Sequence, residues 1–219
     1  MELAIRIVAV LVASYLIGGI PWALIIGKSV YHIDLRTCGS GNLGATNVFR
    51  ELGARAALFT LFLDAFKGVV AVLVAGFIVP SSVWTPTTSE WVAVGAMAAA
   101  VVGHSYSPYI RLSGGKGVAT SAGALFVLTP AAAFIELLVF ALVVSTSRIV
   151  SLGSIAVALT YPLLTLRLYP DNRPTQITVT ALAALVLWRH RANIVRIARG
   201  EERKISVRGR GRSHSDTEE

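Results

Sequence analysis

The feature that most constrains this chain is a series of long apolar segments separated by short polar stretches. A membrane-spanning helix needs about 20 mostly apolar residues, and several of these segments approach that length. The chain of 219 residues is 54% hydrophobic and only 15% charged, which excludes disorder and argues against an ordinary soluble domain. We therefore predict an all-α fold, a polytopic helix bundle embedded in the membrane. We place the apolar segments at residues 3–27, 56–79, 91–106, 119–130, 131–147, 149–167 and 175–189.

The placement of lysine and arginine decides between an odd and an even number of segments. Pro130 separates the fourth and fifth segments, which could be two short helices or one kinked helix. Lysine and arginine collect on cytoplasmic loops. With seven segments and an outside N-terminus, most cations fall on residues 28–55, 107–118 and 189–219, and the outer loop PSSVWTPTTSEW has none. We predict about seven membrane segments, some of them short, with the N-terminus outside and the C-terminus in the cytosol.

The chain is expected to form one domain followed by a polar tail. The apolar segments recur without a linker, so residues 1–203 are predicted to be a single integral membrane domain. Residues 204–219 are basic and then acidic without apolar periodicity, and we expect them to be disordered or to lie against anionic lipid headgroups. Nucleic-acid binding is not expected from so short a basic piece. The stretch GGIPWALIIGK lacks the usual small-x-small cleavage site, which argues against a removed signal peptide.

Three polar stretches fall on the same side of the membrane in this topology. They are GSGNLGATNVFR (39–50), GHSYSPYIRLSGGKGVAT (103–120) and HRANIVRIARGEE (190–202). Their common location at the cytosolic face indicates a single site, open to the cytosol and bordered by lipid.

The second stretch has the form of an anion-binding loop. Gly114, Gly115, Lys116 and Gly117 lead directly into an apolar segment. Glycines let successive backbone N–H groups line a concavity at the start of a helix, and the lysine adds a full positive charge. This is not a nucleotide P-loop, because Gly117 and Arg111 occupy the positions of its Ser/Thr and first glycine. The pattern favours phosphate binding, and a tight interhelical turn is the alternative.

The first stretch offers different donors for the same chemistry. Ser40, Asn42, Thr46 and Asn47 supply hydroxyls and amides, and Arg50 supplies a fork for bidentate phosphate binding. Thr46 or Asn47 could also cap the helix that follows. One cap needs only one such residue, so four of them indicate binding as well.

The third stretch reads as an amphipathic helix that continues from the last segment. His190 and Asn193 share a face at i, i+3 spacing and meet the membrane border, which favours a site over a merely solvated basic helix. Asp64 and Lys67 lie inside the second segment, where ionisable residues are costly; they pair with each other, or Lys67 helps to hold an anion. His104, at the end of the third segment, either makes an interhelical hydrogen bond or belongs to the site.

These three stretches and the segments between them make the chain resemble the bacterial acyl-phosphate-dependent glycerol-3-phosphate acyltransferases. The similarity covers over a third of the chain in the order that the family has. One departure is SYSPYI, which stands where the family usually has a Phe-Pro-Val-like run after its Gly-His pair. No GxSxG motif, His-x4-Asp motif or metal-ligand spacing is present. The matching pieces are GGIPWALIIGK, DLRTCGSGNLGATNVFRELG, LDAFKG, GHSYSPYIRLSGGKGVAT, RIVSLGSI and HRANIVRIARGEE.

The resemblance implies transfer of a fatty acyl group from acyl phosphate to the 1-hydroxyl of sn-glycerol 3-phosphate, giving lysophosphatidic acid and phosphate. It implies a multi-pass protein of the bacterial plasma (inner) membrane with its active site at the cytoplasmic face, no cofactor, no metal, and transient contact with the enzyme that produces acyl phosphate. By motif match, the catalytic residues are His190, Asn193, Lys116 and Ser40. The predicted substrate-binding residues are Arg36, Gly41, Asn42, Gly44, Thr46, Asn47, Arg50, Lys67, His104, Gly114, Gly115, Gly117 and Arg191.

A membrane transporter for phosphate or organophosphate anions is the alternative function. Transporters also place helix N-termini and glycine breaks near a charged site. They need access from both sides and usually carry paired repeats. The one-sided clusters and the absence of a visible repeat favour the enzyme.

Overall fold

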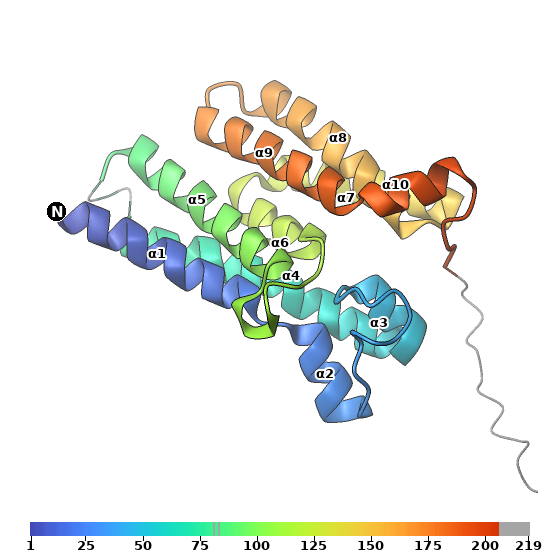
Figure 1. The fold of residues 1–219 in the computed structure, drawn as a ribbon. Coiled ribbons are helices and arrows are strands. Elements are labelled where there is room, and N and C mark those ends of the chain that lie inside the picture. The colour runs from blue at the N-terminus through green and yellow to red at the C-terminus, as the bar shows by residue number, and fades with distance from the viewer. Residues whose placement is uncertain (81, 83, 206–219) are drawn as a thin grey trace, which may run out of the picture.

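The computed structural model describes residues 1–80, 82 and 84–205, and within this part the regular elements are all helices, with no strand (Figure 1). The predicted all-α class is therefore confirmed. Most of the predicted tail, residues 206–219, lies outside the described residues. The helices are α1 (Glu2–Gly19), α2 (Trp22–Tyr31), α3 (Ala45–Leu52), α4 (Ala54–Ile78), α5 (Pro86–Ser105), the 3-10 turn η1 (Pro108–Ile110), α6 (Val118–Leu128), α7 (Pro130–Ser147), α8 (Val150–Leu168), α9 (Arg173–Arg189) and α10 (Arg191–Ala198).

Four helical stretches of the described chain are long and apolar enough to cross a membrane. They are Glu2–Tyr31, which combines α1 and α2, then α4, α7 and α8. Large apolar side chains such as Leu58, Phe62 and Phe77 point outward from α4. Such a surface suits lipid, which replaces water as the solvent and has no need of polar contacts. The chain is an integral membrane protein, and its number of spans and the sides of its termini remain predictions.

The first predicted segment is divided into two helices. Residues 3–27 were expected to form one segment, but α1 ends at Gly19 and α2 begins at Trp22. Pro21 between them has no N–H to continue the hydrogen-bond ladder. Between the two helices, the carbonyl oxygen of Ile20 accepts hydrogen bonds from the Trp22 N–H at 3.1 Å and from Lys67 Nζ at 3.0 Å. In Figure 1, α2 runs away from the axis of α1.

Helices that are distant in sequence pack through glycines. A Cβ atom on Gly68 (α4) would collide with the carbonyl oxygen of Thr120 (α6), and one on Gly123 (α6) would collide with that of Ala65 (α4). Gly18 makes the same close approach between α1 and α5, against Ala100. Small residues of this kind let helix backbones approach closely in membranes.

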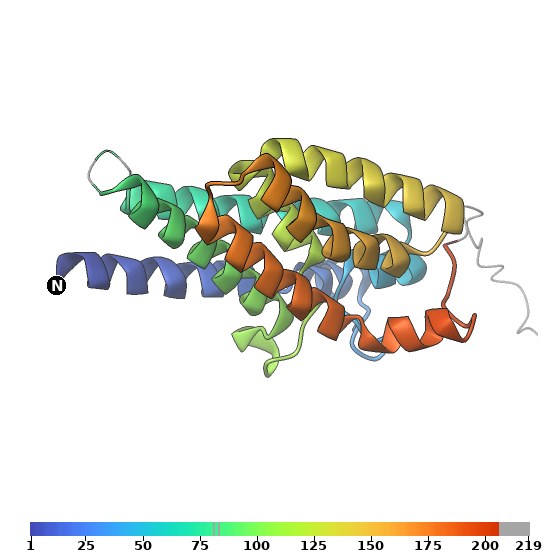
Figure 2. The ribbon, with the colours of Figure 1, turned by 90° about the horizontal axis from the view of Figure 1, so that it is seen from above.

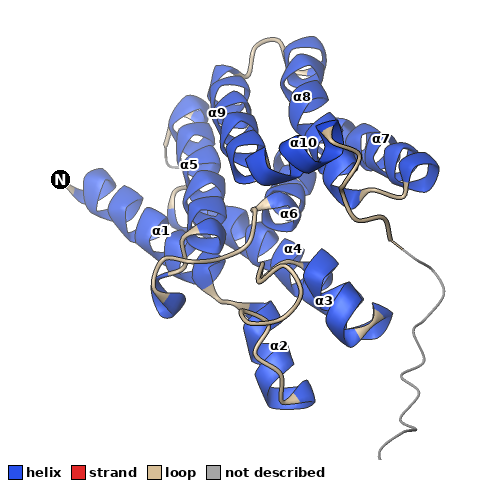
Figure 3. Cartoon of the chain, turned by 45° about the vertical axis from the view of Figure 1, so that its right-hand side comes forward, coloured by secondary structure: helices blue, strands red, loops and turns tan. Residues whose placement is uncertain are grey.

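The bundle has two parts joined by α5 and α6. Helices α1, α4 and α5 pack together on one side, while α7, α8 and α9 pack together on the other, with α6 against α4, α5 and α7 (Figures 1 and 2). Buried apolar residues of α4 to α9, Met97 and Tyr161 among them, form the largest core cluster. The three polar stretches, residues 39–50, 103–120 and 190–202, gather at the end of the bundle that is opposite to the N-terminus, where α2, α3 and α10 lie (Figures 1 and 3).

Candidate active site

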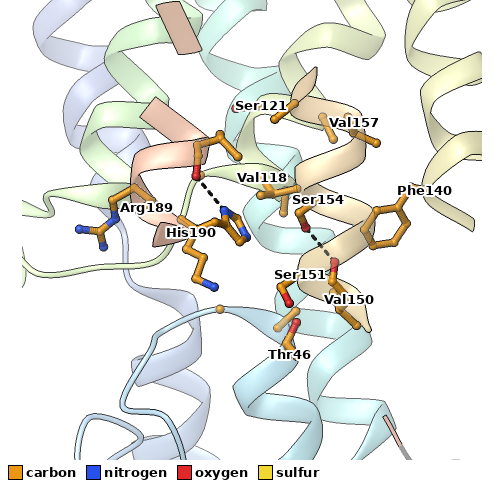
Figure 4. A pocket seen from close by; sticks show the side chains of 18 of the residues that line it. Thr46, Val118, Ser121, Phe140, Val150, Ser151, Ser154, Val157, Arg189 and His190 are labelled. Atoms are coloured by element: carbon orange, nitrogen blue, oxygen red, sulfur yellow. Dashed lines mark hydrogen bonds between the residues drawn. The ribbon is translucent and has the colours of Figure 1, made fainter. Parts of the chain in front are cut away.

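A cavity of about 720 Å³ connects this polar end to the interior of the bundle. Its polar end is lined by Ser40, Arg50, Lys116, His190 and Asn193. They come from α3 and the loop before it, from the loop before α6, from the break between α9 and α10, and from α10. Its inner part is lined by apolar side chains of α4, α6, α7, α8 and α9. Figure 4 shows Thr46, Ser151 and His190 around one space, although they belong to different elements. The polarity of the cavity therefore suits a molecule with a charged head and an apolar tail.

A chain of hydrogen bonds fixes the polar end. Lys116 Nζ donates to Asn193 Oδ1 at 2.5 Å, and Asn193 Nδ2 donates to Glu202 Oε1 at 2.6 Å. Ser151 donates to the same carboxylate oxygen at 2.8 Å, and Arg196 Nε donates to Oε2 at 2.6 Å. Burial alone would raise the pKa of Glu202, but the hydrogen bonds from Asn193, Ser151 and Arg196 outweigh burial and leave this pKa below its usual value. Glu202 therefore stays ionised and orients the Asn193 amide so that its oxygen faces Lys116.

The ammonium group of Lys116 is partly removed from water. Burial lowers its pKa to about 8, which the negative charge of Glu202 opposes and the positive charge of Arg196 reinforces. An anion bound at the cavity would restore the preference of this group for its charged form.

The glycine-rich loop that carries Lys116 is held from behind. Arg189 Nη2 donates to the carbonyl oxygens of Gly114 and Gly115 at 3.0 and 2.8 Å. The N–H of Gly115 donates to the His104 carbonyl oxygen at 3.1 Å, and a Cβ on Gly115 would collide with the His104 ring. Gly117, with φ of 82°, then starts α6, and residues of its first turn line the cavity. The unpaired N–H groups of this turn are the part of the loop that is suited to an anion.

Asn47 has a different role from the helix cap that the sequence suggested. The N-cap residue of α3 is Gly44, and no side chain caps this helix, so the expectation for Thr46 or Asn47 was wrong. Asn47 is 2% exposed, and its Oδ1 accepts from the backbone N–H and the hydroxyl of Ser40 at 3.0 and 3.2 Å. Its Nδ2 donates to the Cys38 carbonyl at 3.2 Å. The loop folds back over α3, so the Asn47 side chain makes its hydrogen bonds to polar groups of the loop and not to the N–H groups of its own helix.

His190 lies at a break between two helices. The predicted continuous helix is interrupted here, because α9 ends at Arg189 and α10 begins at Arg191. The ring atom Nδ1 lies 2.8 Å from the Val186 carbonyl oxygen (Figure 4). A carbonyl can only accept, so Nδ1 carries the proton and Nε2 is left as an acceptor. Burial, followed by the charge of Lys116, lowers the pKa of His190 to about 4. The imidazole is therefore neutral at neutral pH and is a weak base.

Two arginines of the first polar stretch have different surroundings. Arg50 lines the cavity, and its Nη2 donates to the carbonyl oxygen of Arg203 at 3.1 Å. Burial lowers the pKa of the Arg50 guanidinium. Arg36 is outside the cavity and forms an exposed ion pair with Asp34, in which Nη2 and Oδ2 are 2.6 Å apart. The hydrogen bond from Arg36 holds the pKa of Asp34 well below its usual range.

Comparison with known proteins identifies the family. Residues 8–200 match the family model described as glycerol-3-phosphate acyltransferase. The chain belongs to this family. The glycerol-3-phosphate acyltransferase of Synechococcus elongatus is 41% identical over 204 residues, which cover 93% of this chain and 97% of the relative. That of Thermus thermophilus is 40% identical over 204 residues, 92% of this chain and 96% of the relative.

Solved structures agree with the family assignment. The crystal structure of PlsY, an integral membrane glycerol 3-phosphate acyltransferase, in its glycerol 3-phosphate form superposes with a TM-score of 0.81 at 33% identity. The match covers 91% of this chain and 96% of that one. The lysophosphatidic acid form of PlsY gives a TM-score of 0.79 at 32% identity, with 91% and 95% coverage. These relatives support an acyltransferase and give no support to the transporter alternative.

The structure of this family member brings most of the predicted site residues to one cavity. The predicted residues that line it are Ser40, Asn42, Gly44, Thr46, Asn47, Arg50, His104, Lys116, Gly117, His190, Arg191 and Asn193. Those that do not line it are Arg36, Gly41, Lys67, Gly114 and Gly115. Lys67 is buried in an ion pair with Asp64, at 2.8 Å, and Asp64 also lies 3.5 Å from His104 Nδ1.

Three residues of this candidate site were not assigned from the sequence, and they are Ser151, Arg189 and Glu202. Their contacts join segments that are far apart in sequence, such as Ser151 with Glu202, so no local spacing could reveal them. The available signal was the presence of Ser151 in RIVSLGSI, one of the matching pieces. Among the described residues, no group of His, Cys, Asp and Glu could hold a metal ion.

Proposed function

We propose that this enzyme transfers a fatty acyl group from acyl phosphate to the 1-hydroxyl of sn-glycerol 3-phosphate, giving lysophosphatidic acid and inorganic phosphate. The observation that carries the proposal is the cavity itself, in which a cationic polar end continues into an apolar interior. The names of the relatives support the acceptor, and the two ligand forms of PlsY match the proposed acceptor and product. Acyl phosphate as the donor rests on the sequence resemblance and on the space for an anion at the start of α6.

Two phosphate groups must be held together against their mutual repulsion. Coulomb repulsion between phosphate dianions is large where water is scarce, so cations are required. Arg50 and Lys116 line the same end of the cavity and supply them. We assign glycerol 3-phosphate to Ser40, Arg50 and Lys116. We assign the acyl phosphate headgroup to Asn42 and to the first-turn N–H groups of α6.

The transfer needs little acid–base force, because acyl phosphate is a mixed anhydride and is already activated. The 1-hydroxyl oxygen of glycerol 3-phosphate attacks the acyl carbon, and the bond from that carbon to the phosphate oxygen breaks. The hydroxyl proton passes to a phosphate oxygen of a substrate. His190 Nε2 accepts a hydrogen bond from the glycerol and orients it, since a base with a pKa of about 4 is too weak to deprotonate an alcohol. The N–H donors of the loop stabilise the oxyanion that develops on the acyl carbonyl.

The proposed location is the bacterial plasma (inner) membrane, with the site at the cytoplasmic face. The gathering of the three polar stretches at one end of the bundle supports a one-sided site (Figure 3). A soluble acceptor reaches this end directly, and a lipid-borne acyl chain reaches the inner cavity. A transient contact with the enzyme that produces acyl phosphate would deliver the donor to the same end.

The test compares two acyl donors with the purified protein in detergent. Acyl phosphate with glycerol 3-phosphate is expected to give lysophosphatidic acid and one inorganic phosphate per product. Acyl-CoA in place of acyl phosphate is expected to give no product. A Lys116→Met variant should lose activity, while Leu138→Met, on the exposed face of α7, should keep it. Product formation from acyl-CoA alone would overturn the donor assignment.

A further inference from the structure

Besides Asp64, which pairs with Lys67, the lining of the cavity includes a carboxyl group that the proposed reaction does not use. Glu136 lies on α7, lines the cavity beside Ala133, Leu137 and Phe140, and is 3% exposed. Thr160 on α8 donates to Glu136 Oε2 at 2.8 Å. Within the described chain, Oε1 has no hydrogen-bond partner and no cation lies at ion-pair distance. An ionisable side chain at this position is costly and points to a function in the cavity.

The distance of Glu136 from the polar end can be read along α8. Ser151 contacts Glu202 at the polar end, and Thr160, the partner of Glu136, is nine residues further along the same helix. At 1.5 Å per residue this is about 13–14 Å. An all-trans alkyl chain advances about 1.3 Å per carbon, so about ten carbons bring an acyl chain to Glu136. Tyr161, the next residue, hydrogen-bonds Thr129 at 3.0 Å and makes this level of the cavity polar on a second side.

The cavity also has a lateral opening near this level. Three side chains that line it, Leu61, Phe126 and Leu137, are exposed on the outer surface of the bundle. They come from α4, α6 and α7, so the cavity opens toward lipid between these helices. Phe140 on α7 and Val157 on α8 also line the cavity (Figure 4). An alkyl chain thus has two routes from the polar end, inward past Glu136 or sideways into lipid.

The carboxyl group decides between these routes. A methylene group cannot donate to Oε1, so a chain seated over Glu136 would bury an unsatisfied polar atom, whereas the lateral route does not. We propose that Glu136 is a specificity-determining residue: the cavity holds about the first ten carbons of the acyl chain, and Glu136 turns the remainder out into lipid. This inference rests on the proposed acyl transfer.

If the role of Glu136 were purely structural, one hydrogen-bonding oxygen on this side chain would be enough. The hydrogen bond to Thr160 uses one oxygen, and a glutamine would keep a polar group there. This difference provides the test. Glu136→Met removes the polar atoms at nearly constant volume, Glu136→Gln keeps them without a charge, and Leu138→Met is a control on the outward face of the same helix, where Leu138 is 54% exposed.

Each variant is assayed with acyl phosphates of 8, 10, 16 and 18 carbons. The readout is kcat/KM of the variant divided by that of the wild type at the same length, which cancels partitioning into detergent micelles. For Glu136→Met we expect a ratio near 1 at 8 and 10 carbons and about tenfold at 16 and 18, equivalent to about 1.4 kcal/mol. Glu136→Gln and Leu138→Met should keep ratios near 1 throughout.

A length-independent ratio for Glu136→Met overturns the inference, and so does a rise for Glu136→Gln that equals that for Glu136→Met. A second variant keeps the inference testable if Glu136→Met folds poorly. Val157→Gln places a polar group about one helical turn nearer the polar end of the cavity. For this variant the series is extended to an acyl phosphate of 6 carbons. Val157→Gln should reduce kcat/KM from about seven carbons upward, about three carbons before the chain reaches Glu136, and leave the 6-carbon substrate unchanged. An equal loss at 6 carbons would contradict the inference. If the wild type uses no acyl phosphate, the proposed function is overturned. If the wild type is active but Glu136→Met leaves the length profile unchanged, only the present inference is overturned.

Discussion

At the scale of single residues, the chemistry of the site depends on groups held in unusual protonation equilibria. Lys116 is the clearest case, because burial lowers its pKa to about 8 while Asn193 accepts its hydrogen bond at 2.5 Å. Below its pKa the lysine is charged and can bind phosphate, and above this pKa the charge is lost. Loss of this charge in the free enzyme should therefore weaken its reaction with the phosphorylated acceptor in alkaline solution.

We predict that kcat/KM for glycerol 3-phosphate falls as the pH rises through about 8. This parameter reports ionisations of the free enzyme and free substrate, so the lowered pKa of Lys116 should be visible in it. Lys116→Arg keeps a charge that does not titrate in this range, so its residual activity should persist to higher pH. The measurement is the pH profile of both proteins from 6 to about 10. An identical alkaline fall in Lys116→Arg would show that another group is responsible.

Glu202 leads to a second prediction at this scale. Its carboxylate accepts hydrogen bonds from Ser151, Asn193 and Arg196, so Glu202→Gln replaces one acceptor oxygen by a donor that clashes with a donor partner. We expect kcat to fall about tenfold or more and the free energy of unfolding to fall by about 1–3 kcal/mol. The neighbouring Glu201 is exposed and provides the control, since Glu201→Gln should change stability by less than about 0.5 kcal/mol. Steady-state kinetics and thermal unfolding in detergent measure both; equal effects of the two substitutions would contradict this role.

At the scale of helices, the sequence predicted most elements, and the exceptions have physical causes. Hydropathy located α4 to α9 within a few residues, because each is an apolar run between polar ends. The break at Pro21 was missed because the apolar run continues through it. A hydropathy average does not register that proline lacks a backbone N–H. The break at His190 was missed for a related reason. The i, i+3 spacing of His190 and Asn193 predicts a continuous helix, whereas the chain turns between α9 and α10.

Helix packing gives a prediction that composition alone could not. Gly123→Ala would push a methyl group into the Ala65 carbonyl and separate α6 from α4, costing about 1–3 kcal/mol of stability. Activity should fall with it, because the start of α6 forms part of the site. Gly76→Ala on α4 is the matched control: a Cβ there has no atom within 4 Å, so the change should be neutral or slightly stabilising. Melting temperatures in detergent, with activity measured alongside, test the pair, and equal melting temperatures would contradict tight packing at Gly123.

At the scale of the whole molecule, the sequence predicted which segments form the site but not how they are connected. Ser40, Arg50, Lys116, His190 and Asn193 do meet at one cavity, and their common side of the membrane was the reason to expect this. The structure adds the long-range contacts, such as that of Arg50 with the Arg203 carbonyl. These depend on three-dimensional placement, and spacing along the chain carries no information about them.

The orientation of the molecule can be tested with its own cysteine. Cys38 is the one cysteine of the chain and lies in the partly exposed loop before α3, at the polar end of the bundle. If this end faces the cytosol, a membrane-impermeant maleimide should leave Cys38 unlabelled in intact spheroplasts and label it in inverted vesicles. A Cys38→Ser, Thr87→Cys double variant moves the thiol to the exposed start of α5 and should give the opposite pattern. Labelling of Cys38 from outside would reverse the charge-based topology and place the polar end of the cavity out of reach of a cytosolic acceptor.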